Sequence, residues 1–459
     1  MQVSVRDTKS RGSSGWAAFF LVFALGWGAA WTAAPLRAQG IHTAPVVIQG
    51  FRVKPALYHP LAMYRVYRTD FDGTAVPIPF QIDEINEWGD YVLDQGSEVT
   101  KRSGNGLFDL QDELVVMGDD VGPLKRPTKW SGGVKPDILF EFAIRFRGPE
   151  RPDRTEGGIY VAVFFAQPPP PTEKRYVVFN RPNAEVLTSR YKYGFDQKNW
   201  LVARSVELRP RGAAETAAGV PVLDSTTFWL KADLKYFLTM EVNHRSINSA
   251  LEAWKSGPVR SIVRVSFHYT MLRLNFELGM YTEISFFSNA VFLPAIMYNP
   301  IDGDRSLNRG SGFYYGMALK DNPADYRIES NMPVWKESGM LDFFKTRTKV
   351  EPLYWVSATG RERMLYMEIA PSKQMKEQGA VPMMYREDLA GPALSNRGAD
   401  KPSPLGKGPV NLALFFDLTK FSKGEHIMAF RLFFENLVDE KRLSAFRTLT
   451  KWDFEATRL

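Results

Sequence analysis

The sequence predicts an all-β protein: a small N-terminal β-barrel or sandwich followed by a larger β-supersandwich, with few helices. Two observations carry this prediction. Apolar and polar residues alternate with a period of two in "PVVIQGFRVK", "AMYRVYRTD", "DILFEFAIRFRG" and "GGIYVAVFFAQ", which is typical of half-buried strands. The same segments are rich in β-branched and aromatic residues, which favour strands.

The first 38 residues predict a secretory signal peptide. Basic residues at positions 6, 9 and 11 precede an apolar stretch from Trp16 to Ala34, and small residues lead to a cleavage site after Ala38. The alternative is a retained anchor, because this stretch approaches the ~20 residues that span a bilayer. No later segment is as long and apolar, so we expect a periplasmic or secreted protein with no transmembrane helix after cleavage.

The composition excludes several classes of function. The chain has no cysteine, which excludes disulfides, thiol nucleophiles, thiolate metal sites and c-type haem attachment. Removal of residues 1–38 takes away four basic residues and one acid, so the formal charge falls from +7 to +4. The remaining Lys and Arg residues are spread along the chain, which argues against a nucleic-acid partner.

The tetraproline at Pro168–Pro171 separates two predicted domains, 39–171 and 172–459, because consecutive prolines do not fit inside a sheet. In the second domain, residues 259–298 alternate continuously apart from one expected turn around 278–281. Strands of that length suggest a large sandwich.

A few segments depart from the strand pattern. Residues 246–257 begin with a Ser that could cap a helix and end with Gly, and residues 437–449 have helical spacing, so both predict helices. Residues 385–409 are dense in Gly, Pro, Asn and Asp, which predicts a long surface loop. Two alternating strands are expected after it, joined through "FSKGE".

The stretch "SGNGLFDLQDELVVMGDD" (103–120) combines an Asn-Gly turn with several acids. An EF-hand calcium loop needs oxygen ligands at fixed positions around a central Gly, here Gly106. The oxygen-bearing residues then fall at Ser103, Asn105, Asp109 and Asp112. Lys101 occupies the first ligand position, which disfavours calcium. The hypothesis of a calcium site at Asn105, Asp109 and Asp112 therefore competes with a plain acidic turn that leads into a strand.

A catalytic interpretation pairs these acids with Asp83, Glu84 and Glu87 in "PFQIDEINEWGD", because paired carboxylates can transfer protons when one is desolvated. The competing interpretation is a set of solvated acids at strand ends. No two of the five histidines lie three or four residues apart, so the helical zinc signature is absent. No cofactor motif is found, and the catalytic residues stay unknown.

The segment "YNPIDGDRSLNRGSGFYYG" (298–316) predicts a substrate-binding loop. Sugar rings stack on aromatic faces while their hydroxyl groups bond to carboxylates and amides. The candidate residues are Tyr298, Asp302, Asp304, Arg305, Asn308, Tyr314 and Tyr315. The alternative is a long loop capped by its own Asp side chains.

Two motifs resemble a known family. "AVPIPFQIDE" followed by "GLFDLQDELVVMGDDVG" resembles the small N-terminal barrel of exported polysaccharide-processing proteins. "SGPVRSIVRVSFHY" (256–269) resembles the strand that opens the mutarotase-like supersandwich of rhamnogalacturonan-lyase-like proteins. The resemblance covers about a quarter of the chain and implies the fold; none of that family's catalytic residues maps onto a position here.

The leading hypothesis for function is an exported β-protein that binds a glycan or other surface polymer without covalent chemistry. The alternatives are a polysaccharide lyase or glycosidase that uses the acidic segments, and a structural or accessory subunit, with a protein partner, of an exported or outer-membrane-associated assembly.

Overall fold

The computed structural model describes residues 22–24, 44–148, 151–209, 219–235, 238–244, 247–271, 274–299, 301–320, 326–332, 335–336, 353–360, 363–388, 410–436 and 451–458. Strands dominate these residues, and the α-helices among them are the short α1 (Gly303–Ser306) and α3 (Lys373–Gln378). The predicted all-β fold with few helices is therefore confirmed.

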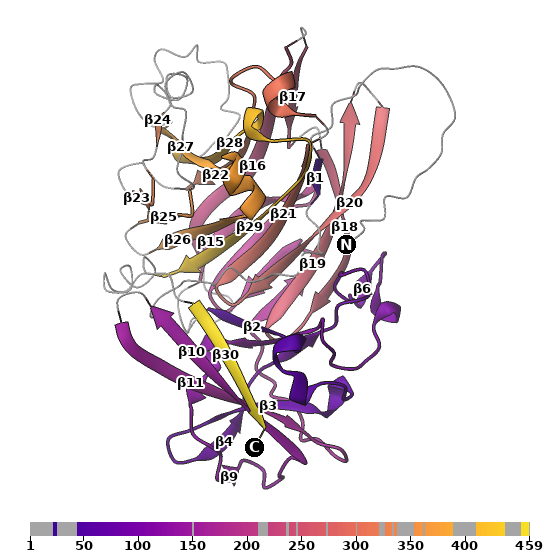
Figure 1. Cartoon of the computed structure of the whole chain (residues 1–459), viewed down its shortest axis with the longest axis vertical. Helices are drawn as coiled ribbons and strands as arrows, with labels where there is room; N and C mark the ends of the chain where they lie inside the picture. The colour runs from indigo at the N-terminus through magenta and orange to yellow at the C-terminus, as the bar shows by residue number, and fades with distance from the viewer. Residues whose placement is uncertain are drawn as a thin grey trace.

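Two ten-stranded sheets form the larger part of the molecule (Figure 1). The first has the order β23 (Arg327–Ser330), β25 (Trp355–Thr359), β26 (Met364–Pro371), β29 (Gly424–Glu435), β21 (Ala290–Asn299), β20 (Leu274–Phe287), β19 (Arg260–Met271), β18 (Ile247–Ser256) and β6 (Gln95–Gly96), with β1 (Val22–Ala24) paired to β21. The second has the order β12 (Val177–Asn180), β13 (Glu185–Thr188), β14 (Tyr191–Asp196), β15 (Asn199–Leu208), β16 (Val220–Asp233), β22 (Gly312–Leu319), β28 (Val410–Asp417), β27 (Met383–Asp388) and β24 (Trp335–Lys336), with β17 (Thr239–Asn243) paired to β16.

The two large sheets pack face to face around one apolar core. Phe286 of β20 meets Tyr193 and Phe195 of β14, with ring centroids 5.1 and 5.6 Å apart. Tyr315 of β22 stacks on Phe430 of β29 at 5.9 Å. Inward-facing aromatic and aliphatic side chains of this kind are what the alternating sequence pattern supplies.

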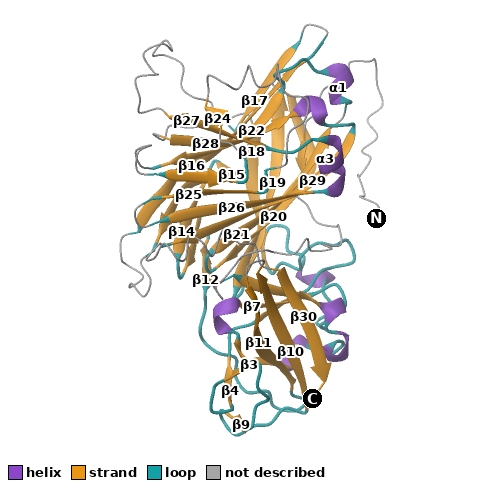
Figure 2. Cartoon of the chain, turned by 60° about the vertical axis from the view of Figure 1, so that its left-hand side comes forward, coloured by secondary structure: helices purple, strands orange, loops and turns teal. Residues whose placement is uncertain are grey.

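A smaller β unit lies below the sandwich in Figures 1 and 2. Its seven-stranded sheet has the order β30 (Lys451–Arg458), β10 (Ile138–Gly148), β11 (Arg151–Val163), β3 (Tyr64–Thr69), β4 (Thr74–Pro77) and β9 (Lys129–Trp130), with β8 (Gly122–Pro123) paired to β11. Its three-stranded sheet has the order β2 (Pro45–Gln49), β7 (Glu113–Met117) and β5 (Gln81–Asp83). The C-terminal strand β30 therefore completes a sheet whose other strands come from the N-terminal part of the chain. The proposed boundary near residue 171 stays a prediction.

Strand β7 joins the two parts of the molecule. All five of its residues are buried. Leu114 and Val116 belong to the core of the smaller unit, whereas Val115 and Met117 belong to the core of the sandwich. This explains the uninterrupted apolar run in the sequence, because a strand covered on both faces has no solvent side to alternate with.

Two local predictions are wrong. Residues 247–256 form strand β18 instead of a helix, because this segment pairs along its length with β19, and Ala253 and Trp254 also pair with β6. The turn expected at 278–281 lies inside β20, and the chain instead reverses between β19 and β20 and at Ser288 and Asn289, between β20 and β21. In both segments, pairing with neighbouring strands outweighs local propensity.

Other predictions are confirmed in outline. The tetraproline lies in the connection between β11 and β12. The two strands on either side of "FSKGE" are β28 and β29, which belong to opposite sheets of the sandwich. The predicted loop 385–409 is wrong at its start, because residues 385–388 belong to β27 and pair with β28. Residues 389–409 and 437–449 lie outside the described residues, as does the predicted signal peptide except for β1. In the described ranges, no helix combines the length and the hydropathy that a membrane crossing needs.

Candidate functional site

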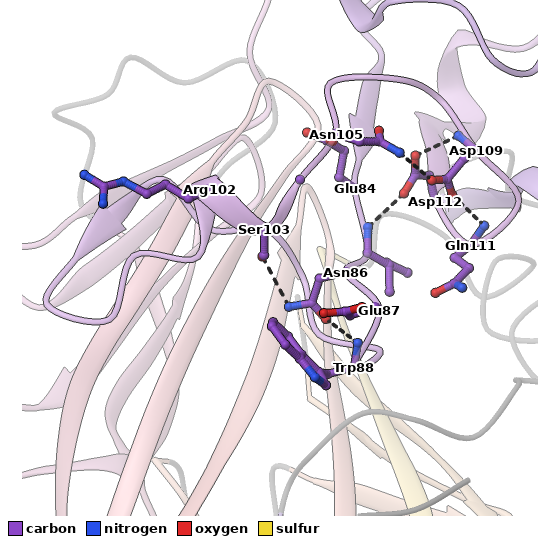
Figure 3. Close-up of a pocket in the computed structure, with 12 residues that line it drawn as sticks. Glu84, Asn86, Glu87, Trp88, Arg102, Ser103, Asn105, Asp109, Gln111 and Asp112 are labelled. Carbon is purple, nitrogen blue, oxygen red and sulfur yellow. Dashed lines mark hydrogen bonds between the residues drawn. The ribbon is translucent and has the colours of Figure 1, made fainter. Parts of the chain in front are cut away.

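A pocket of about 680 Å³ lies where the chain leaves β5 and where it returns into β7 (Figure 3). Its walls come from two segments, 84–88 and 102–112. The first contains the candidate catalytic acids Glu84 and Glu87, and the second contains the acidic turn with the candidate calcium ligands. The structure brings the two segments together.

The end of the β5–β7 ladder sets the direction of the pocket residues. Asp83 and Glu113 are the last cross-strand pair. Because successive side chains of a strand point to opposite faces, the neighbouring residues Glu84 and Asp112 point the other way, and both line the pocket.

A tight turn after β5 presents the first wall. Asn86 is buried at 4% exposure, and its Oδ1 accepts the backbone N–H groups of Trp88 and Asp90, each at 3.0 Å. Gly89 closes the turn with a φ of 88°, a conformation that glycine adopts without steric cost. The turn leaves Glu87 exposed and Trp88 64% exposed at its tip.

An Asn-Gly turn shapes the second wall, as the sequence predicted. Asn105 Oδ1 accepts the N–H of Leu107 at 2.8 Å, and Gly106 has a φ of 73°. The amide of Asn105 donates to Asp109 Oδ2 at 3.1 Å. The "ELVVM" strand follows, so the turn and the strand after it are confirmed. The expectation that the acids are solvated is wrong for Asp112 and Glu113, which are 1% and 5% exposed.

Two carboxylates fasten the walls to each other. Asp112 Oδ1 accepts the N–H of Ile85 and its Oδ2 accepts the N–H of Asp109, both at 2.8 Å (Figure 3). Glu84 Oε1 accepts the N–H of Gly106 at 2.7 Å. Burial raises the pKa of Asp112 to about 7, because its effect is larger than that of the two backbone N–H groups, which lower the pKa. Asp112 is 1% exposed and therefore acts as a structural link within the pocket.

The pocket carries an uncompensated negative charge. Glu84, Glu87, Asp109 and Asp112 line it, and across the described ranges none of them forms an ion pair with Lys or Arg. Arg102, also in the lining, extends away from these acids (Figure 3). An anionic ligand would meet repulsion here.

The remaining polar groups suit a ligand rich in hydroxyl groups. Ser103, Asn105 and Gln111 add a hydroxyl and two amides to the lining, and Trp88 adds an aromatic face. Aromatic faces stack on the C–H faces of sugar rings, while carboxylates and amides bond to their hydroxyls.

The three residues proposed as calcium ligands do lie together in this pocket. Their oxygens, however, already accept hydrogen bonds from the chain: Asn105 Oδ1 from Leu107, Asp109 Oδ1 from Gln111 at 3.0 Å, and both Asp112 oxygens from backbone N–H groups. Within the part of the chain that the structure describes, no group of three or more His, Cys, Asp or Glu residues could hold a metal ion. Calcium binding stays a prediction.

Three other predicted acids lie outside the pocket. Asp83 is fully buried between β5 and the sandwich, where it pairs with Lys255 and Arg260. Asp302 and Asp304 lie at helix α1, at the far end of the sandwich. Asp83, Asp109, Asp302 and Asp304 therefore do not share one cleft.

The predicted substrate-binding residues 298–315 do not form one loop. Tyr314 and Tyr315 lie inside strand β22: Tyr315 packs in the sandwich core, and Tyr314 stacks on Trp229 of β16 at 4.9 Å. Their rings point to opposite faces because they are consecutive strand residues. Asn308 bonds to the carbonyl of Leu234 at 3.3 Å.

The polar end of this segment is open to solvent. Asp302 and Arg305 form an exposed pair at 3.8 Å, and Tyr298 is 39% exposed. The carbonyl of Asp304 accepts a hydrogen bond from Lys235 Nζ at 2.7 Å. A binding role for these residues stays a prediction, and it no longer has the support of Tyr314 and Tyr315 beside them.

Trp88 is the pocket residue that the sequence interpretation missed. The signal for it was present in "NEWGD", because Asn and Gly at this spacing predict a tight turn, and an aromatic residue at a turn tip is exposed.

Comparison with known structures gives distant similarities. An alpha-mannosidase from Enterococcus faecalis V583 is 9% identical, with a TM-score of 0.42, over 92% of this chain and 45% of that chain. A glycosyl hydrolase family 38 protein from Enterococcus faecalis is 8% identical, with a TM-score of 0.40, over 92% of this chain and 46% of that chain. The chain thus spans less than half the length of either structure.

No protein-family model and no curated protein matches the sequence. Neither similar structure confirms the resemblance to rhamnogalacturonan-lyase-like proteins.

Proposed function

We propose that this chain binds a neutral polysaccharide in the pocket formed by residues 84–88 and 102–112, without covalent chemistry of its own. The observation that carries the proposal is the exposure of Trp88, 64%, beside carboxylates that no Lys or Arg of the described ranges neutralises. An exposed indole next to hydrogen-bond acceptors is an arrangement that suits a sugar ring.

The charge of the pocket favours neutral sugars. A uronic acid would bring a further carboxylate beside Glu84, Glu87 and Asp109, and like charges in a partly desolvated pocket repel. A neutral sugar presents hydroxyl donors, which the carboxylates accept. The proposal includes export of the protein to the periplasm or the medium, where it would meet such polymers.

Affinity electrophoresis tests this function. The full chain is run through native gels that contain galactan, mannan, xylan, β-glucan or polygalacturonate. We expect retardation in at least one neutral gel and loss of that retardation in Trp88→Ala. In polygalacturonate, Trp88→Ala should migrate like the wild type, because any retardation there comes from the net positive charge and not from the pocket. The matched control is Phe71→Ala, which removes an aromatic side chain that is 89% exposed at the β3–β4 turn and does not line the pocket.

Migration unchanged by every neutral polymer would overturn the proposal. Equal loss of retardation in Trp88→Ala and Phe71→Ala would also overturn it, because it would show general surface adhesion.

A lyase or glycosidase activity has less support. Asp112 is the pocket acid whose pKa lies near neutrality, as a proton-transfer group requires. Both of its oxygens, however, are occupied by backbone N–H groups. Release of reducing or unsaturated ends from the same polymers, abolished by Asp109→Asn, would favour the enzyme over a binding protein.

A further inference from the structure

Each wall of the pocket adjoins a pair of consecutive acids, where the chain leaves β5 or enters β7. Asp83 precedes Glu84, and Glu113 follows Asp112. In each pair one carboxylate lines the pocket, while the other is buried on the opposite side, at 0% exposure for Asp83 and 5% for Glu113. The buried carboxylates are directly opposed across β5 and β7, where like charges destabilise a sheet.

A single arginine from the sandwich joins the two buried carboxylates. Arg260 of β19 is 2% exposed. Its Nε lies 2.7 Å from Asp83 Oδ2, and its Nη2 lies 2.7 Å from Glu113 Oε2. The planar guanidinium can make both contacts at once because its donors form a rigid fork. A residue of the other part of the molecule therefore contacts both strand ends.

Gln81 Nε2 donates to both oxygens of Asp83, at 2.8 and 2.9 Å, and two more groups contact the cluster. Lys255 Nζ of β18 lies 2.7 Å from Asp83 Oδ1. The hydroxyl of Tyr91 donates to Glu113 Oε2 at 2.8 Å, and its ring centroid lies 4.7 Å from the Arg260 guanidinium carbon. Tyr91 follows the turn that carries Trp88, so the cluster also holds the far end of the first pocket wall.

We propose that Arg260 is a positioning residue of the pocket: by joining Asp83 to Glu113 it fixes the spacing between segments 84–88 and 102–112, and thereby the affinity for a neutral polysaccharide. The affinity part rests on the proposed function. The spacing part does not, because it concerns the backbone hydrogen bonds that close the pocket, donated by Ile85, Asp109 and Gly106.

The test compares two conservative substitutions of buried arginines. Arg260→Lys keeps the positive charge but removes the planar guanidinium whose Nε and Nη2 contact the two carboxylates. Arg431→Lys is the matched control: Arg431 is 5% exposed in the same sheet, and it pairs with Glu368 at 3.2 Å, away from the pocket. Amide hydrogen exchange of the full chain is followed by mass spectrometry in peptides that cover 84–88 and 102–112.

We expect faster exchange of both peptides in Arg260→Lys and unchanged exchange in Arg431→Lys. In the polysaccharide gel that retards the wild type most, the affinity of Arg260→Lys should fall about tenfold, as expected for coupling between linked sites. Wild-type exchange rates in Arg260→Lys, equal acceleration in Arg431→Lys, or unchanged affinity despite faster exchange would each overturn the proposal.

The exchange measurement separates this proposal from the proposed function. If no polymer retards the wild type, the proposed function fails, whereas exchange still decides whether Arg260 fixes the spacing. Glu113→Gln is the second variant if Arg260→Lys does not fold, because it keeps the side-chain size but removes the carboxylate that Arg260 Nη2 contacts. Faster exchange of both peptides supports the proposal, and unchanged exchange overturns it.

Discussion

Replacement of Arg260 by Met should destabilise the protein strongly. The substitution keeps an unbranched apolar stem but removes the guanidinium cation that joins Asp83 and Glu113. Lys255 still faces Asp83, so Glu113 becomes a buried carboxylate whose strongest remaining contact is the Tyr91 hydroxyl. Removing one partner of a buried ion pair is costly because it leaves an uncompensated charge in a site with little water.

The expected loss of unfolding free energy is about 3–5 kcal/mol. An independent figure comes from Asp83 alone. Burial would raise its pKa, but Lys255 and Arg260 outweigh burial and hold the pKa at about 2, below the ordinary 3.8. That difference corresponds to about 2 kcal/mol of stability, at 1.36 kcal/mol per pKa unit, and Arg260→Met loses only the share that Arg260 supplies, because Lys255 remains. The larger figure includes Glu113, which loses its cation altogether.

The pH dependence follows from the same shift. A carboxyl whose folded pKa is lowered stabilises the protein above its unfolded pKa, and this contribution disappears as the pH falls from about 4 through about 2. The deficit of Arg260→Met relative to the wild type should therefore be complete at pH 7 and shrink as acid protonates the carboxyls. Urea unfolding followed by circular dichroism at a series of pH values measures it.

A charge-neutral double variant separates electrostatics from packing. Glu113→Gln, added to Arg260→Met, removes the unpaired carboxylate and keeps the side-chain size, while Asp83 keeps its ion pair with Lys255. We expect the double variant to recover most of the lost stability, because exchange of a buried ionic group for a neutral one is often close to neutral in free energy. A double variant as unstable as Arg260→Met would refute the electrostatic reasoning.

Two predictions concern the pocket itself. In Gly104→Ala the new Cβ would lie 2.7–2.9 Å from the Glu84 carboxylate. The carboxylate should move off the Gly106 N–H, so retardation in polysaccharide gels should weaken while stability falls by only about 1 kcal/mol; full retardation would contradict this. Asp112→Asn loses one of two acceptor oxygens, at a cost of about 1–3 kcal/mol in urea unfolding. Because the folded pKa of Asp112, about 7, lies above 3.8, wild-type stability should fall as the pH rises from about 4 through 7. Parallel pH profiles of the wild type and Asp112→Asn would count against this role.

Much of the fold could be predicted because its signals are local. The alternation in the long strands requires only that one face of each sheet be buried. The errors arose where the deciding partner is distant. Residues 247–256 have a helical pattern in isolation and become β18 because β19 and β6 offer hydrogen bonds on both sides. No feature inside 278–281 shows that β20 runs through it in register with β19.

The site shows the same division. Each wall was recognised as an acidic segment, but their meeting depends on the pairing of Asp83 with Glu113. The residue that joins these two carboxylates, Arg260, lies 177 and 147 positions away from them in the chain. Trp88 could have been recognised from its turn. Conversely, Tyr314 and Tyr315 were assigned to a loop although their flanking residues, "GFYYGMAL", also suit a strand.

The most direct test of the central claim is an exchange footprint with the bound polymer. Amide hydrogen exchange of the wild type is measured with and without a saturating amount of the neutral polysaccharide that retards it in gels. We expect protection in peptides covering 84–88 and 102–112, where Trp88 and the pocket acids lie. Protection confined to residues 298–308, around Tyr298, Asp302 and Arg305, with none at the pocket, would contradict the account.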